Sequence, residues 1–318
     1  MGQSVKEESN KEINDSQFQD NFAGNNILCC IGHITKDKII TPESTIYMTG
    51  GTSFYFSYAM NRLPQRVKFS LVTAMDPKET EPVEKMRQAG IDVTLFPSHH
   101  TVFFENIYGD NPNDRTQRVL AKADPFTVGQ LQSFNANIYH LGSLLRDDFP
   151  LSIVKYLAKK GRVSIDAQGY LREVRGKNVY PIDWKEKKEV LQYTYYLKVN
   201  ETEMETITGK KDPKEAALEL HQWGVQEVCI TLGSLGSIIY VNGQFYQIPA
   251  YPPHKFVDAT GCGDTYSAGY LYCRMQGKSP AEAGRYAAAM CTLKLEHNGP
   301  FNGTEEDIKN ILEENSIR

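Results

Sequence analysis

The sequence lacks several patterns that would place it in a well-known class. No apolar run approaches the length that crosses a membrane. The formal net charge of −4 shows none of the basic excess expected of a nucleic-acid or membrane-surface binder. There is no GxxxxGK followed by Ser or Thr, and no GxGxxG opens the first strand–helix unit. These two absences argue against a P-loop NTPase and a dinucleotide-binding dehydrogenase.

The amino-terminal stretch is polar and has no apolar core of the kind found in secretory signals. We therefore interpret residues 1–25 as a mobile polar tail. The six cysteines lie mostly within apolar strand or helix patterns, and none forms a CxxC pair. This pattern indicates buried free thiols and a cytoplasmic protein.

From residue 26 to residue 318, short apolar runs alternate with helix patterns. The predicted strands are 27–31, 67–73, 91–96, 138–142, 162–166, 195–199 and 227–231, followed by a hairpin of 237–241 and 244–248. Repeated strand–helix units imply a mostly parallel sheet with helices on both faces. Ligands bind such sheets at the carboxyl ends of the strands.

Two segments depart from this alternation. Residues 38–48 contain two short β-branched runs, and residues 101–120 contain two further strand patterns around a turn at 109–114. We expect these segments, within about 35–49 and 98–122, to form a small sheet that projects from the main body.

Residues 258–264 combine two glycines and an acid directly before a helix pattern. Gly261 and Gly263 lack Cβ atoms, so the backbone can bend sharply and a ligand can come close. The unpaired amides and partial positive charge of a helix amino terminus attract anions. The Asp264 carboxylate would repel a bound phosphate, so its presence here predicts a base that takes the proton of an attacking hydroxyl.

Asn200 and Glu203 follow the strand that ends at residue 199. In one interpretation Asn200 only caps the next helix, with Glu203 as a helpful acid at its third position. In the other, the pair holds a hydrated Mg²⁺ beside a nucleotide, and Lys198 meets a phosphate.

Other polar or glycine-rich segments also follow strands, and each has a structural and a functional interpretation. Thr231, Gly233 and Gly236 form either a tight turn or a nucleotide site, and Gly50-Gly51 either a tight helix entry or a substrate contact. Asp37 is a solvated acid in a polar loop or a hydroxyl ligand. The acid, amide and guanidinium of 166–172 suit a strand-end salt bridge or hydroxyl recognition; these groups are Asp166, Gln168 and Arg172.

Together, these segments resemble the ribokinase-like (PfkB) carbohydrate kinases over about residues 27–300. Residues 258–264 resemble the family's carboxyl-terminal signature, and Asn200 with Glu203 its NxxE motif. The 231–236 segment is similar to its nucleotide-binding turn, and 32–37 with Gly50-Gly51 to its substrate region.

The resemblance implies a three-layer α/β/α sandwich with a mostly parallel central sheet and a small β lid. It implies transfer of the ATP γ-phosphate to a hydroxyl of a sugar or polyol. Asp264 would be the general base, with the Gly261, Cys262 and Gly263 amides as the anion hole. Mg²⁺ would be organised, mainly through water, by Asn200 and Glu203. The other implied contacts are Lys198, Thr231, Gly233, Gly236 and Gly261 for the nucleotide, and Asp37, Gly50, Gly51, Phe54, Asp166, Gln168 and Arg172 for the acceptor.

Two departures from the family pattern bear on the substrate and on activity. Cys262 stands where Ala is more usual, but its amide is unaffected, so we expect activity to survive. Phe54 and its aromatic neighbours replace the Asn and small residues of ribokinases, which disfavours ribose. The 95–104 and 166–172 segments look more like the myo-inositol kinase branch.

Alternatives to this interpretation are a nucleoside kinase of the same superfamily and a catalytically silent sugar or nucleotide sensor. An exposed lid sheet is able to pair with its twin in a homodimer, and a single lid is also compatible with a monomer.

Overall fold

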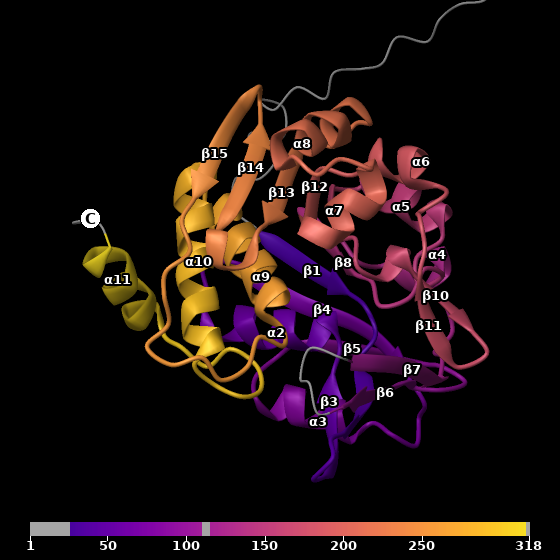
Figure 1. Cartoon of the computed structure of the whole chain (residues 1–318). Coiled ribbons are helices and arrows are strands. Elements are labelled where there is room, and N and C mark those ends of the chain that lie inside the picture. The colour runs from indigo at the N-terminus through magenta and orange to yellow at the C-terminus, as the bar shows by residue number, and fades with distance from the viewer. Residues whose placement is uncertain (1–25, 110–114, 316–318) are drawn as a thin grey trace, which may run out of the picture.

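A computed structural model describes residues 26–109 and 115–315. The predicted tail and the tip of the predicted 109–114 turn lie outside them. The main sheet has nine strands in the order β15-β14-β13-β12-β9-β8-β1-β4-β5 (Figure 1). Neighbours from β13 to β5 are parallel, whereas β14 and β15 are antiparallel. The bounds are β1 Ile27–Ile31, β4 Lys68–Met75, β5 Val93–Pro97, β8 Ile138–Gly142, β9 Arg162–Asp166, β12 Tyr196–Asn200, β13 Glu227–Thr231, β14 Ser237–Val241 and β15 Gln244–Ile248.

Helices cover both faces of this sheet, as the alternating pattern predicts. Side chains of β1 point alternately to opposite faces, so Leu28 and Cys30 join one apolar core while Cys29 and Ile31 join the other. The first core contains α2 Thr52–Arg62, α3 Glu81–Gln88, α9 Cys262–Met275, α10 Pro280–Leu295 and α11 Glu305–Glu314. The second contains α4 Val128–Leu131, α5 Leu151–Ala158, α6 Lys187–Leu191, α7 Glu201–Thr208 and α8 Pro213–Gln222. The three-layer sandwich is therefore confirmed.

A second sheet, here called the lid sheet, has six strands in the order β10-β11-β7-β6-β2-β3 (Figure 1). Its strands are β2 Thr35–Ile40, β3 Thr45–Gly50, β6 Val102–Tyr108, β7 Arg115–Ala121, β10 Arg172–Arg175 and β11 Asn178–Pro181. The first four were predicted. The β10–β11 hairpin was not, because its sequence is polar and lacks the apolar alternation by which strands are recognised.

One local prediction was wrong. Asp37 lies not in a loop but within β2, opposite Met48 of β3 and Phe104 of β6. In α2 the side chain of Phe56 is fully buried and that of Tyr55 is 3% exposed, while Phe54 is half-buried and packs against the same apolar core. This helix packs against both the main sheet and α9, so it buries a broader face than a single stripe.

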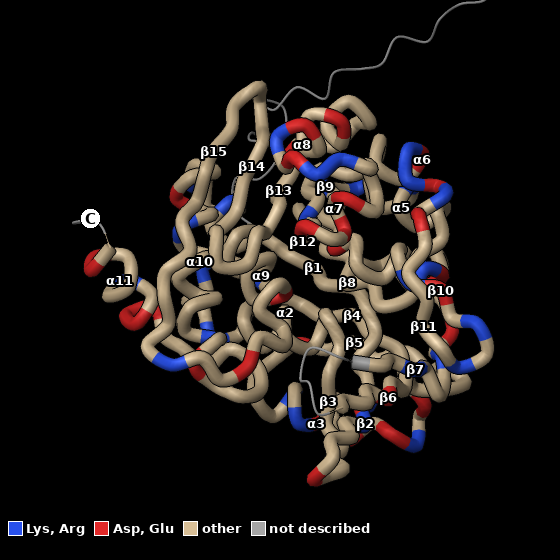
Figure 2. The backbone as a smooth tube through the Cα atoms, in the orientation of Figure 1, with Lys and Arg blue, Asp and Glu red and all other residues tan. Residues whose placement is uncertain are grey.

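Among the described residues most charged side chains are at least partly exposed, and the buried exceptions include Asp166, Glu203 and Lys294. Figure 2 shows both signs along the outer helices, whereas β1 and β8 carry no charged residue. Among the described residues, no helix is long and apolar enough to cross a bilayer. The six cysteines are free thiols and four of them are buried, as the sequence predicted.

Candidate active site

The amino terminus of α9 carries the two glycines and the acid of the 258–264 segment. Gly261 is the residue before the helix and has φ +76°, and a Cβ added there would collide with the Tyr55 ring. A Cβ on Gly263 would lie 2.8 Å from Nζ of Lys198. One glycine is thus required by backbone handedness and packing, and the other leaves space for an ammonium group. Asp264 lies in the first helical turn and is half-buried.

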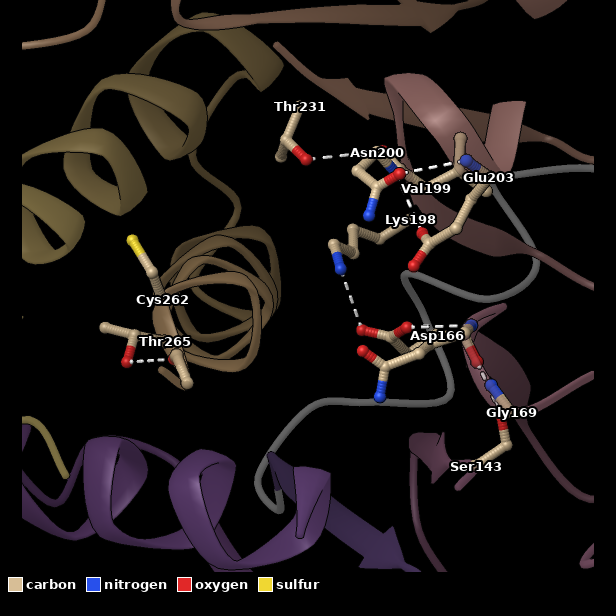
Figure 3. Close-up of polar contacts among 12 residues, drawn as sticks. Ser143, Asp166, Gly169, Lys198, Val199, Asn200, Glu203, Thr231, Cys262 and Thr265 are labelled. Atoms are coloured by element: carbon tan, nitrogen blue, oxygen red, sulfur yellow. Dashed lines mark hydrogen bonds and ion pairs between the residues drawn. The ribbon is translucent and has the colours of Figure 1, made fainter. Parts of the chain in front are cut away.

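That ammonium group belongs to a buried ion pair. Lys198 on β12 lies opposite Asp166 on the neighbouring strand β9. Its Nζ is 3.0 Å from Asp166 Oδ2, and the two side chains are 13% and 2% exposed (Figure 3). Asp166 Oδ1 accepts a hydrogen bond from the backbone N–H of Gln168 at 3.1 Å. Asp166 therefore forms the predicted strand-end salt bridge, and Lys198 carries its charge to the α9 terminus.

Two further carboxylates, those of Glu203 and Asp264, act electrostatically on Lys198. Burial, followed by the negative charge of Asp166, raises the pKa of Asp264 to about 8, although Lys198 opposes the shift. Burial also raises the pKa of Glu203. Burial disfavours the charged form of Asp166, but Lys198 outweighs it and lowers the pKa of Asp166. Since general bases work best with a pKa near the operating pH, Asp264 suits proton transfer.

Asn200 and Glu203 bind each other across the start of α7. The backbone N–H of Glu203 donates to Asn200 Oδ1 at 2.9 Å, and the backbone N–H of Asn200 donates to Glu203 Oε2 at 2.8 Å (Figure 3). This reciprocal arrangement is a capping box. The structural interpretation of the motif is therefore correct, and it leaves Glu203 Oε1 outside the box.

Asn200 and Glu203 are the residues that could hold a hydrated Mg²⁺. Asp166, Glu203 and Asp264 all act electrostatically on Lys198, and Arg172 also acts on Glu203. Among the described residues, no three His, Cys, Asp or Glu side chains gather as a complete metal-ligand set. An ion held here would therefore keep most of its waters, as Mg²⁺ commonly does.

The turn after β13 lies beside Asn200. Thr231 is the register partner of Asn200, and its hydroxyl donates to the Val199 carbonyl at 3.4 Å (Figure 3). Gly236 has φ +91°, and a Cβ there would collide with the backbone of β15. Gly233 has φ +56°, and a Cβ added there would meet no atom within 4 Å. Gly236 is thus needed for the hairpin, whereas Gly233 leaves room for a ligand.

On the opposite side, the lid sheet brings Asp37 to the start of α2. A Cβ on Gly50 would collide with the Asp37 carboxylate, and one on Gly51, at φ +99°, would lie 2.7 Å from a backbone carbonyl. Phe54 stacks edge-on against the rings of Tyr55 and Tyr58. Arg172 begins β10, and its charge acts on the more distant Glu203.

Sequence reasoning assigned no polar role to Tyr55. Its side chain is buried, and its hydroxyl has no hydrogen-bond partner among the described residues. Burial raises the pKa of Tyr55, and the negative charges of Asp258, Asp37 and Asp264 raise it further. The ring therefore lies between the lid sheet and the α9 terminus. In the sequence Tyr55 was only one of the aromatic neighbours of Phe54, and its hydroxyl was given no role because an aromatic residue within a helix pattern is normally assigned to the core.

Comparison with known proteins agrees with this arrangement. Residues 33–307 match the family model described as pfkB family carbohydrate kinase. The chain belongs to the pfkB family of carbohydrate kinases. Both the predicted fold and the predicted enzyme class are thereby confirmed.

Individual family members differ in substrate. A cytidine kinase of Thermococcus kodakarensis is 26% identical over 270 residues, which cover 81% of this chain and 92% of that protein. A pyrophosphate-dependent kinase in the ribokinase family, solved with a pyrophosphate analogue and myo-inositol, superposes with a TM-score of 0.80 at 27% identity, covering 89% and 99% of the two chains. Arabidopsis thaliana ribokinase, solved with ribose and ATP, has the same fold, with a TM-score of 0.73 at 20% identity and coverage of 91% and 99%.

Proposed function

We propose that this pfkB-family kinase transfers the terminal phosphoryl group of ATP to a hydroxyl of a polyol or sugar, with Asp264 as the general base. The observation that carries the proposal is the position of Asp264 in the first turn of α9, beside Gly263 and the Lys198 ammonium. Backbone amides there stabilise the charge on the transferred group, while the carboxylate accepts the hydroxyl proton. Phosphoryl transfer needs mainly such positioning and charge stabilisation.

Each neighbouring group has a part in this scheme. Lys198 stays charged, because the surrounding acids outweigh its burial and raise its pKa, and it meets a donor phosphate. Asn200 and Glu203 hold the waters of Mg²⁺, which when bound neutralises phosphate charge. Gly233 makes room for the nucleotide. The Cys262 amide donates to the Ala259 carbonyl at 3.1 Å, so it is available to an anion only after this turn opens.

The acceptor is expected between the lid sheet and α2. Asp37 and Asp264 both act electrostatically on Tyr55 there, and such a group of polar side chains suits a molecule with several hydroxyls. The lid sheet would exclude water, which otherwise competes as the phosphoryl acceptor. The structural neighbour bound to myo-inositol favours a cyclic polyol.

A nucleoside is the second candidate acceptor, favoured by the similarity to a cytidine kinase and by the aromatic group of Phe54, Tyr55 and Tyr58. Such rings would stack on a base. A catalytically silent sensor is the non-enzymatic alternative for this site, but a sensor that only binds its ligand does not need the Asp264 carboxylate beside Gly261 and Gly263.

A screen of acceptors and donors tests the proposal. Purified protein with Mg²⁺ is given myo-inositol, ribose, fructose, fructose 6-phosphate, adenosine, inosine and cytidine, each with ATP and, separately, with pyrophosphate. Phosphorylated product is detected by ³¹P NMR. We expect turnover of a polyol with ATP. A pyrophosphate-only reaction would correct the donor, a nucleoside-only reaction would correct the acceptor, and tight binding without product would support the sensor.

The lid sheet also offers a surface for self-association. β3 is an edge strand, and its Ile46 and Tyr47 side chains are 51% and 60% exposed. We expect the edges of two copies to pair in a homodimer. Sedimentation velocity of the wild type and Tyr47→Lys distinguishes the outcomes: a dimer that the substitution dissociates supports pairing, and a wild-type monomer contradicts it.

A further inference from the structure

One fully buried charge has no part in the mechanism above. Lys294 lies in the last turn of α10 and is 0% exposed. Lysine is rarely buried to this extent, and a buried ammonium must be matched by acceptors. Its place in an alanine-rich helix pattern gave no indication of this role in the sequence.

Oxygen atoms surround the Lys294 ammonium. Its Nζ donates to the Asp258 carbonyl at 3.1 Å and to the His297 carbonyl at 3.1 Å, and it lies 3.5 Å from the Asp258 carboxylate. An enclosed set of two carbonyls and one carboxylate, around a single positive charge, is also what a bound K⁺ or NH₄⁺ would require. In this protein the Lys294 ammonium supplies that positive charge.

These contacts fasten the segment that leads into the anion hole. Asp258 precedes Gly261 by three residues, and its second carboxylate oxygen accepts from the Thr260 amide at 2.9 Å. The Val257 amide donates to the Leu295 carbonyl at 2.7 Å. The end of α10 therefore holds this segment through both backbone and side chain. Lys294, after the hydrogen bond from Cys291, also lowers the pKa of Cys262, so its charge reaches the α9 terminus.

We propose that Lys294 acts as a built-in monovalent cation: a positioning residue that fixes Asp258, and with it the start of residues 258–264, at the α9 terminus where the transferred phosphoryl group is proposed to bind. The inference rests on the proposed role of the α9 terminus. It implies that the wild-type enzyme needs no added monovalent ion. It also implies that removing the side chain creates a site that such an ion can fill.

The experiment compares cations in three proteins. Wild-type turnover is measured in K⁺, Na⁺ and tetramethylammonium salts at equal ionic strength, and we expect equal kcat in all three. Lys294→Ala, in tetramethylammonium, should lose about 10²-fold in kcat, the scale of a small misplacement of catalytic groups. K⁺, NH₄⁺ or propylammonium should restore most of that loss and raise its melting temperature, because a ligand that binds the folded state stabilises it.

Lys294→Met and Lys160→Ala serve as controls. Met fills the space without a charge, so Lys294→Met should lose kcat and respond to no cation. Lys160 also donates to two backbone carbonyls, those of Gln132 and Phe134, but at the start of β9 and away from the site. Lys160→Ala should keep wild-type kcat in every salt.

Several results would overturn the inference. A wild-type kcat that depends on K⁺ would show that the site still requires an ion. Wild-type kcat in folded Lys294→Met would show that the charge is not needed. Rescue of stability without rescue of kcat would reduce Lys294 to a cap on α10. An absence of any wild-type turnover would instead count against the proposed function.

Discussion

Lys198 and Asp166 form an ion pair 3.0 Å long between neighbouring parallel strands, at the edge of the sheet where the site lies. The pair is nearly closed to solvent, and its cation lies beside Gly263. It therefore has two roles that experiments can separate: it neutralises a buried acid, and it delivers a positive charge to the α9 terminus.

Lys198→Met should lower both stability and activity. Removing one partner of a buried pair leaves an unpaired carboxylate and costs about 3–5 kcal/mol. The double variant Lys198→Met/Asp166→Asn removes that unpaired charge, so chemical denaturation should show recovered stability. Its kcat should stay low, because the phosphate contact is still missing. Recovery of kcat in the double variant would assign the pair a structural role alone.

Asp264→Asn should abolish most turnover while leaving the donor bound. Loss of a general base lowers kcat by at least about 10²-fold. Calorimetry should show ATP binding close to that of the wild type. Asp212→Asn, at the amino-terminal cap of α8, is the matched acid-to-amide change and should not alter kcat. Near-normal turnover in Asp264→Asn would remove this residue from the mechanism.

The raised pKa of Asp264 predicts a pH profile. The base must be deprotonated to act, so kcat/KM should rise with pH and level off above about 8. Stability should move the other way: the folded protein keeps a proton that the unfolded chain loses near a pKa of about 3.9, so Asp264 costs stability as pH rises from about 4 to about 8. Thermal melts should show Asp264→Asn gaining stability relative to the wild type across that window, and a constant difference would refute the shift.

Gly261→Ala and Gly277→Ala form a matched pair. The two glycines have φ +76° and +75°, so Ala should cost each about 1–2 kcal/mol of left-handed strain. A Cβ on Gly277 meets nothing within 4 Å, whereas one on Gly261 collides with Tyr55. We expect Gly277→Ala to keep wild-type kcat and Gly261→Ala to lose it along with further stability. Equal melting temperatures of Gly261→Ala and Gly277→Ala would show that the Tyr55 ring moves away from the new Cβ at no cost in stability.

Glu203→Gln separates the cap from the metal site. Gln can replace Glu in a capping box, so the melting temperature should hardly change, whereas Glu203→Ala should cost about 1 kcal/mol. Both variants lose the negative charge. Titration of kcat against Mg²⁺ should therefore show an apparent affinity weakened by about tenfold or more in each. Unchanged Mg²⁺ dependence in Glu203→Gln would leave the motif as a helix cap.

Local sequence patterns predicted the main sheet well because its strands are continuous apolar runs, and strand ends mark the site. The position of Asp264 beside Lys198 was not predictable, since the two residues are more than sixty positions apart in the chain and only the tertiary fold brings them together. The polar sequence of β10–β11 has no apolar alternation, so this hairpin was not predicted. The helix cap and the Mg²⁺ site were two alternative interpretations of Asn200 and Glu203. The capping box is compatible with both, because it leaves Glu203 Oε1 outside its hydrogen bonds.

The parallel pairing of β2 with β6 has a consequence for how the chain folds. Between these two lid strands the chain makes α2, β4, α3 and β5 of the main body. Contacts between distant segments form late, because loop closure must precede them. The lid sheet is therefore expected to form only after the intervening elements of the main body have folded. In refolding, hydrogen-exchange protection should reach β1 and β4 before it reaches β2 and β6.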